Sequence, residues 1–248
     1  MTHLPSTFLP LASTGVRSAT AIALSLTISA ALLAAPARAT EPPREPTGAG
    51  QAANEPGALA RLDAFTSDID SFRADFEQTL YDEDSVALQT STGSVVLKRP
   101  GRFVWDYAGG EGGEGQLIVA DGERIWLYDR ELAQVTVNAI DERVAGTPLV
   151  LLMGSAPLEE AYEITVLGDS EGVEWFELVP KAGGGDFESL YVGLDGAGLR
   201  ALELRDTFGQ ATQILFDDFE ANVAIDDATF DFEAPDGVDV IGLGDDGG

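Results

Sequence analysis

The chain contains no cysteine, and its only histidine among 248 residues is His3. Without cysteine no disulfide can support the fold, so the apolar core must stabilise it alone. Without histidine or cysteine beyond His3, the chain cannot build a Ser-His-Asp or Cys-His site, nor the usual zinc and copper sites. It also lacks the D-x-[DN]-x-[DN]-G calcium loop. We therefore expect no metal and no cofactor, and we exclude most hydrolases and redox enzymes, whereas catalysis by Asp and Glu alone stays open.

Positive charge is scarce as well. The chain has 14 Lys and Arg against 43 Asp and Glu, a net charge of −29, and its only lysines are Lys98 and Lys181. Such a surface repels nucleic acid and anionic lipid headgroups, because both are polyanions. We attribute the charge to solubility and expect a monomer that binds no nucleic acid.

The first 39 residues have the pattern of a secretory signal peptide. An n-region without acidic residues ends at Arg17, a mostly apolar stretch covers 19–35, and Ala37-Arg38-Ala39 is a small-x-small cleavage site. The alternative is an uncleaved anchor, for which 17 residues interrupted by serine and threonine are marginal. We expect cleavage after Ala39 and a periplasmic protein.

The rest of the chain divides into three parts. Residues 40–57 are rich in Pro, Gly and Glu and are expected to be a disordered leader, because they cannot bury enough apolar area to offset ordering. Residues 58–241 form the predicted domain, and residues 242–248 a short acidic tail. A lipid-anchored product would need a cysteine after the cleavage site, and none is present.

Apolar periodicity predicts a mainly β domain that begins with one helix. Ala58, Leu59, Leu62, Phe65 and Ile69 recur at helical spacing. From residue 72 onward the period is two, with turn signals such as Asp-Gly at 121–122 and Pro-Gly at 100–101, which suits a type II turn. We predict roughly eleven short antiparallel strands in a barrel or half-barrel, the last at 230–232, with a weaker helix within 217–228.

Two features interrupt this pattern. Thr147 to Gly154 reads as an N-cap, a first-turn proline, an apolar turn and a terminal glycine, which predicts a short helix that is either a lid or a core plug. Arg99 follows Val95 and Leu97 at two-residue steps, so it should share their apolar face, where its donors need carbonyls or a carboxylate. The alternative for Arg99 is a solvated turn residue.

Several strings together resemble the LolA-type periplasmic lipoprotein carriers. The longest is Gly93-x-Val95-x-Leu97-Lys98-Arg99-Pro100-Gly101-x-Phe103-x-Trp105-x-Tyr107. Others follow in the same order: Phe72-x-x-x-Phe76-x-Gln78, Asp121-Gly122-x-x-x-Trp126-x-Tyr128, Thr147-Pro148-x-x-Leu151-Leu152, Asp206-x-x-Gly209-Gln210 and Phe230-x-Phe232-x-x-Pro235. The resemblance spans about residues 59–239. The Gly/Glu-rich stretch 108–115 and the leader depart from it.

The resemblance implies a fold, a task and a set of residues. The fold would be an incomplete antiparallel barrel whose apolar concave face is covered by a lid of short helices. The task, without catalysis, would be to take lipoproteins from an inner-membrane ABC transporter to an outer-membrane receptor. Arg99 would be the lid latch. Residues that would line the cavity or contact partners are Phe76, Val95, Leu97, Phe103, Trp105, Leu149, Leu152 and Leu202.

Two other functions remain possible from the sequence. A periplasmic sensor or adaptor of lipid or lipoprotein could use the same half-barrel, but it would carry a further C-terminal domain for which no residues remain. A two-carboxylate glycosidase would need acidic side chains in a polar cleft, whereas the inward faces here are predicted to be apolar.

Overall fold

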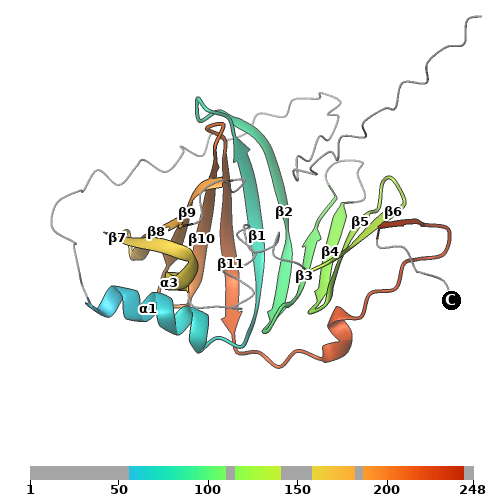
Figure 1. Ribbon diagram of the computed structural model, residues 1–248, viewed down its shortest axis with the longest axis horizontal. Helices are drawn as coiled ribbons and strands as arrows, with labels where there is room; N and C mark the ends of the chain where they lie inside the picture. The colour runs from blue at the N-terminus through green and yellow to red at the C-terminus, as the bar shows by residue number, and fades with distance from the viewer. Residues whose placement is uncertain (1–55, 110–114, 141–157, 182–186, 243–248) are drawn as a thin grey trace, which may run out of the picture. The chain divides into compact units, whose positions relative to one another are not determined.

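A computed structural model describes residues 56–109, 115–140, 158–181 and 187–242, and the fold within them is one twelve-stranded sheet (Figure 1). The helices are α1 (Pro56–Ser67), α3 (Leu158–Ala161) and the 3-10 turn η2 (Asp227–Phe230). The strands are β1 (Ser71–Tyr81), β2 (Ala87–Lys98), β3 (Arg102–Tyr107), β4 (Gln116–Asp121), β5 (Arg124–Asp129), β6 (Gln134–Ala139), β7 (Tyr162–Ser170), β8 (Val173–Pro180), β9 (Phe187–Leu194), β10 (Leu199–Asp206), β11 (Ala211–Ala221) and β12 (Asp239–Gly242).

The sheet is antiparallel and open, as the hairpin signals predict. Its order is β12-β6-β5-β4-β3-β2-β1-β11-β10-β9-β8-β7, and only the β12–β6 pair is parallel. Strand β1 pairs with β11, so the first and eleventh strands join two hairpin meanders. The sheet ends at β7 and β12 instead of closing, which confirms the incomplete barrel. Within the described segments, no helix is long and apolar enough to cross a membrane.

Alternation along β1 places the core on one face of the sheet. Phe72, Ala74 and Phe76 are buried, while Arg73 and Asp75 between them are exposed. The predicted helix α1, in cyan at the lower ends of the strands in Figure 1, buries Ala58, Leu62 and Phe65 in the same cluster. Because a twelve-residue helix is marginal alone, its stability comes from this packing.

The C-terminal segment differs from its prediction. Strand β11 continues to Ala221, so the helix expected within 217–228 is wrong. The strand expected at 230–232 is also wrong, because Phe230 ends η2 and the last strand is β12. Phe230 is buried, and the ring of Phe232 lies 6.1 Å from those of Trp126 and Tyr128. The segment therefore packs on the outer side of the sheet, because Trp126 and Tyr128 alternate with Ile125 and Leu127 of the core.

The β2–β3 turn places Arg99 at the end of a short hairpin. Lys98 pairs with Arg102, which leaves three residues in the turn. Gly101 has φ +69°, the conformation expected for glycine at the second central position of a type II turn. The Arg99–Pro100 bond is cis, which the sequence pattern did not predict.

Candidate functional site

Arg99 fastens the C-terminal end of α1 to the sheet. Its Nη1 donates to the carbonyl oxygens of Phe65 at 3.0 Å, Thr66 at 2.8 Å and Ile69 at 2.5 Å. Its guanidinium carbon lies 5.6 Å from the centre of the Phe65 ring. The last carbonyls of a helix have no partner within the helix and carry partial negative charge, so a cation is favourable here. Arg99 is thus bound to a helix rather than solvated in its turn.

Burial lowers the pKa of Arg99, while the nearby Asp70 carboxylate opposes that shift. An arginine still keeps its charge under these conditions. The three carbonyl oxygens therefore contact a guanidinium whose positive charge does not change with pH. Any release of this contact must come from a competing partner or from movement of α1.

The chain between α1 and β1 is fixed by backbone and side-chain hydrogen bonds. The Arg99 amide donates to the Asp70 carbonyl at 2.7 Å. The Asn222 side chain accepts from the Asp70 amide at 2.9 Å and donates to the Asp68 carbonyl at 3.0 Å. The chain that leaves α1 is therefore tied both to the β2–β3 turn and to the segment after β11.

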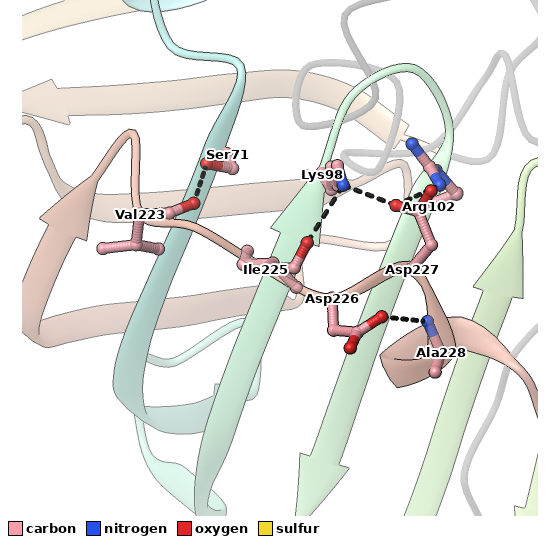
Figure 2. A network of polar contacts seen from close by, with 8 residues as sticks. All are labelled: Ser71, Lys98, Arg102, Val223, Ile225, Asp226, Asp227 and Ala228. Carbon is pink, nitrogen blue, oxygen red and sulfur yellow. Dashed lines mark hydrogen bonds and ion pairs between the residues drawn. The ribbon is translucent and has the colours of Figure 1, made fainter.

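A second polar network surrounds the same turn on its other side (Figure 2). Lys98 donates to the Ile225 carbonyl at 2.9 Å and pairs with Asp227, which also pairs with Arg102 at 2.8 Å. Ser71 donates to the Val223 carbonyl at 2.7 Å. Three cationic side chains in and beside the turn therefore hold its neighbours. Arg99 binds the end of α1, and Lys98 and Arg102 bind the segment after β11.

The middle of α1 is held by an ion pair that the sequence pattern did not predict. Arg61 Nε lies 2.6 Å from Glu174 Oε2 on β8, and the Glu174 side chain is only 9% exposed. Both residues border a cavity of about 490 Å³ that also contacts Ala58, Val166 and Gly168. No sequence signal links positions 61 and 174, because they meet only once the sheet has curved under α1.

The described cavity residues predicted from the sequence come together in one core. Phe76, Val95, Leu97, Phe103, Trp105 and Leu202 are all 1–4% exposed and belong to the same cluster. The ring of Phe76 packs 4.8 Å from that of Trp105. These side chains are therefore covered by the rest of the cluster in this structure. Leu149 and Leu152, with the helix expected at 147–154, lie outside the described residues.

The chemistry of this arrangement is apolar binding. Among the described residues, no group of three His, Cys, Asp or Glu side chains could hold a metal ion. What the concave face offers is a continuous aliphatic and aromatic layer under a helix held by hydrogen bonds and one ion pair. Such a layer suits long alkyl chains, whose transfer from water is favourable in proportion to area.

An open antiparallel sheet with an apolar concave face under a fastened helix defines the class of half-barrel binding proteins. The chain belongs to the family "Outer membrane lipoprotein carrier protein LolA", whose model matches residues 67–233. It is 39% identical over 186 residues to an outer-membrane lipoprotein carrier protein of Dechloromonas aromatica, covering 75% of this chain and 88% of that protein. A protein of the same name from Chromohalobacter salexigens is 42% identical over 187 residues, covering 75% and 87%.

Proposed function

We propose that this protein is a periplasmic carrier that shields the acyl chains of lipoproteins and moves them from the inner to the outer membrane. The observation that carries this proposal is the buried apolar layer on the concave face, closed by a helix fastened through Arg99. Membership in the carrier family supports the same cargo. In this proposal residues 1–39 direct export and are removed after Ala39.

The size of the hydrophobic penalty explains why a carrier is needed. At about 0.8 kcal/mol per methylene, three acyl chains of about 15 methylenes each cost roughly 36 kcal/mol to expose to water. No such cargo crosses an aqueous compartment unshielded. The protein has to cover part of that surface and then give the cargo up, so its closure must be adjustable.

The contacts at α1 provide an adjustable closure. A hydrogen bond contributes about 0.5–1.5 kcal/mol net, and more when one partner is charged. The Arg99 contacts are therefore strong enough to bias α1 toward the sheet and weak enough for the alkyl chains to displace it. In this mechanism acyl chains replace α1 side chains in the core cluster that also holds Phe76 and Trp105, and Arg99 is the latch.

The proposal assigns no catalytic step to the chain. Cargo would arrive from an inner-membrane lipoprotein-releasing ABC transporter and leave to an outer-membrane receptor where one exists. Transfer between such partners needs only that each successive protein binds the cargo more tightly than the one before it, since the acyl chains are covalently unchanged throughout.

Native mass spectrometry tests the carrier and the latch together. The protein would be purified from the periplasm after co-expression with a triacylated lipoprotein, as wild type, Arg99→Leu and the control Arg124→Leu, an exposed arginine on β5. We expect a one-to-one lipoprotein adduct whose occupancy changes in Arg99→Leu and not in the control. An adduct with the same occupancy in Arg99→Leu and in wild type would rule out the latch role of Arg99. If only free protein is detected, under conditions in which a relative with established carrier activity shows its adduct, the proposed carrier function is wrong.

A further inference from the structure

Two hairpin turns at one end of the sheet form an exposed apolar tip. Val86 in the turn between β1 and β2 and Leu88 at the start of β2 are 56% and 53% exposed, and Phe208 in the turn between β10 and β11 is 83% exposed. The two turns touch, because a Cβ on Gly209 would lie 3.3 Å from Glu83 Cβ. Figure 1 shows both tips side by side, at the end of the strands away from α1.

Hydrogen bonds order the backbone of both turns in the tip. Asp206 accepts hydrogen bonds from the amides of Phe208 at 2.8 Å and Gln210 at 2.9 Å. Asp82 accepts from the amides of Asp84 at 3.0 Å and Val86 at 2.8 Å. These Asx turns fix the backbone on both sides of the exposed side chains. A large aromatic ring held in water on an ordered backbone is typical of an interface anchor, because little entropy remains to be lost on binding.

The charge around the tip selects the kind of partner. Glu83 and Asp84 are exposed, and Asp82 and Asp206 lie at the bases of the two turns. Their negative potential, within a chain of net charge −29, repels an anionic membrane surface. It favours a protein surface whose lysines and arginines surround an apolar pocket, since complementary charge steers docking.

We propose that the double-hairpin tip, formed by residues 82–88 and 206–210, docks into an apolar, Lys/Arg-rimmed pocket of a membrane-anchored protein that loads or unloads the carrier. This inference rests on the proposed carrier function, because it assigns the tip to a transfer partner. Phe208 is the anchor, Val86 and Leu88 extend its contact, and the four acidic residues orient the approach. The tip lies apart from the α1 latch, so a partner can dock there while α1 moves.

Leu132 provides a matched control. It is 69% exposed on the β5–β6 turn, and its amide is also held by an aspartate, Asp129, at 3.0 Å. It stands alone on that turn and lacks the second hairpin. Phe208→Ser and Leu132→Ser therefore remove comparable exposed apolar groups from comparable turns, and neither touches the core.

The test measures affinity for the two membrane partners. Purified wild type, Phe208→Ser and Leu132→Ser would be bound to the lipoprotein-releasing transporter in detergent and to the outer-membrane receptor, at 50 and 300 mM NaCl. We expect Phe208→Ser to weaken binding to at least one partner about tenfold or more, and Leu132→Ser to leave it unchanged. Glu83→Gln with Asp84→Asn should flatten the salt dependence. Unchanged affinity of Phe208→Ser for both partners would overturn the proposal.

Two further measurements distinguish docking on a protein from insertion into lipid and from a defective cavity. Flotation with phosphatidylcholine and phosphatidylglycerol vesicles tests lipid insertion, and vesicle binding that depends on Phe208 would overturn docking on a protein. Loading of Phe208→Ser with a fluorescent fatty acid tests the cavity. Normal fatty-acid loading of Phe208→Ser together with weak partner binding supports the docking role of the tip. A wild-type protein that takes up neither fatty acid nor lipoprotein would instead refute the carrier function itself.

Discussion

At the scale of single residues, Arg99 shows how one side chain can close a half-barrel. One guanidinium nitrogen meets three carbonyl oxygens at the end of α1, where helical geometry leaves acceptors unused. A lysine ammonium also carries donors for carbonyl oxygens but could not present a planar guanidinium near the Phe65 ring. The contact therefore combines helix capping with packing against the apolar layer.

Gly93 is a second residue on which the concave face depends. A Cβ at this position would overlap the Asp106 carbonyl oxygen and lie 2.6 Å from Phe76 Cζ. We expect Gly93→Ala to destabilise the fold by about 1–3 kcal/mol, the usual cost of overpacking a core. Thermal unfolding measures this, with Gly196→Ala as control, because nothing lies within 4 Å of a Cβ there. Equal melting temperatures for both variants would contradict the expectation.

The hydroxyl of Tyr107 gives a prediction at alkaline pH. Burial raises the pKa of Tyr107 to about 12, and its hydroxyl donates to the Gln78 side-chain oxygen at 3.0 Å. The unfolded side chain titrates near 10. Between these values the folded state holds a proton that the unfolded state has lost, so the free energy of unfolding falls as pH rises through the window.

Denaturant unfolding at pH 8 to 12 measures that fall. Tyr107→Phe should show a shallower loss of stability above pH 10 than wild type, because it removes one titrating group. Tyr162 and Tyr191 also have raised pKa values and remain in both proteins as an internal reference. Parallel curves for wild type and Tyr107→Phe would show that this hydroxyl does not contribute.

At the scale of elements, Asp227 connects the segment after β11 to the turn that carries Arg99. Lys98, through its hydrogen bond, and Arg102 hold the pKa of Asp227 below its usual range. A lowered carboxyl pKa adds stability above the unfolded value near 3.9 and loses it as pH falls through the folded value. Asp227→Asn should therefore be less stable than wild type at pH 7, and the difference should shrink below about pH 4.

Hydrogen exchange locates this effect. In Asp227→Asn we expect faster exchange across 222–242, because η2 and the following chain lose their tie to β2 and β3. The exposed pair between Arg73 and Glu220 on the same sheet serves as comparison, and Glu220→Gln should leave 222–242 unchanged. A stability gap that persists at pH 3 would point to the Asp227 backbone turn rather than to its charge.

The contrast between elements explains what sequence alone could predict. Helix α1, the β1–β6 meander and the shared face of Val95, Leu97 and Arg99 follow from local periodicity and turn chemistry. The partner of Arg61 and the route of the chain after Ala221 do not. Both depend on where a curved sheet brings distant strands. The sequence around Phe230 and Phe232 does not distinguish a sheet strand from an irregular segment that packs on the outside of the sheet.

At the scale of the whole molecule, the charge imbalance acts on stability. The chain has 43 acidic and 14 basic side chains, and folding brings the acidic ones closer together. Salt screens this repulsion, but it also weakens the surface ion pairs. Each exposed pair contributes about 0–1 kcal/mol, so the pairs found among the described residues cannot outweigh an excess of 29 negative charges. Net screening should therefore stabilise the fold.

We expect the melting temperature to rise by several degrees between about 10 mM and 500 mM NaCl, because the Debye length falls from roughly 30 Å toward a few Å over this range. Choline chloride should give the same rise, since screening does not depend on cation identity. A rise seen only with a divalent cation would instead indicate specific binding by carboxylates. The same screening should weaken docking of the double-hairpin tip to a basic partner, so stability and partner affinity should move in opposite directions as salt is added.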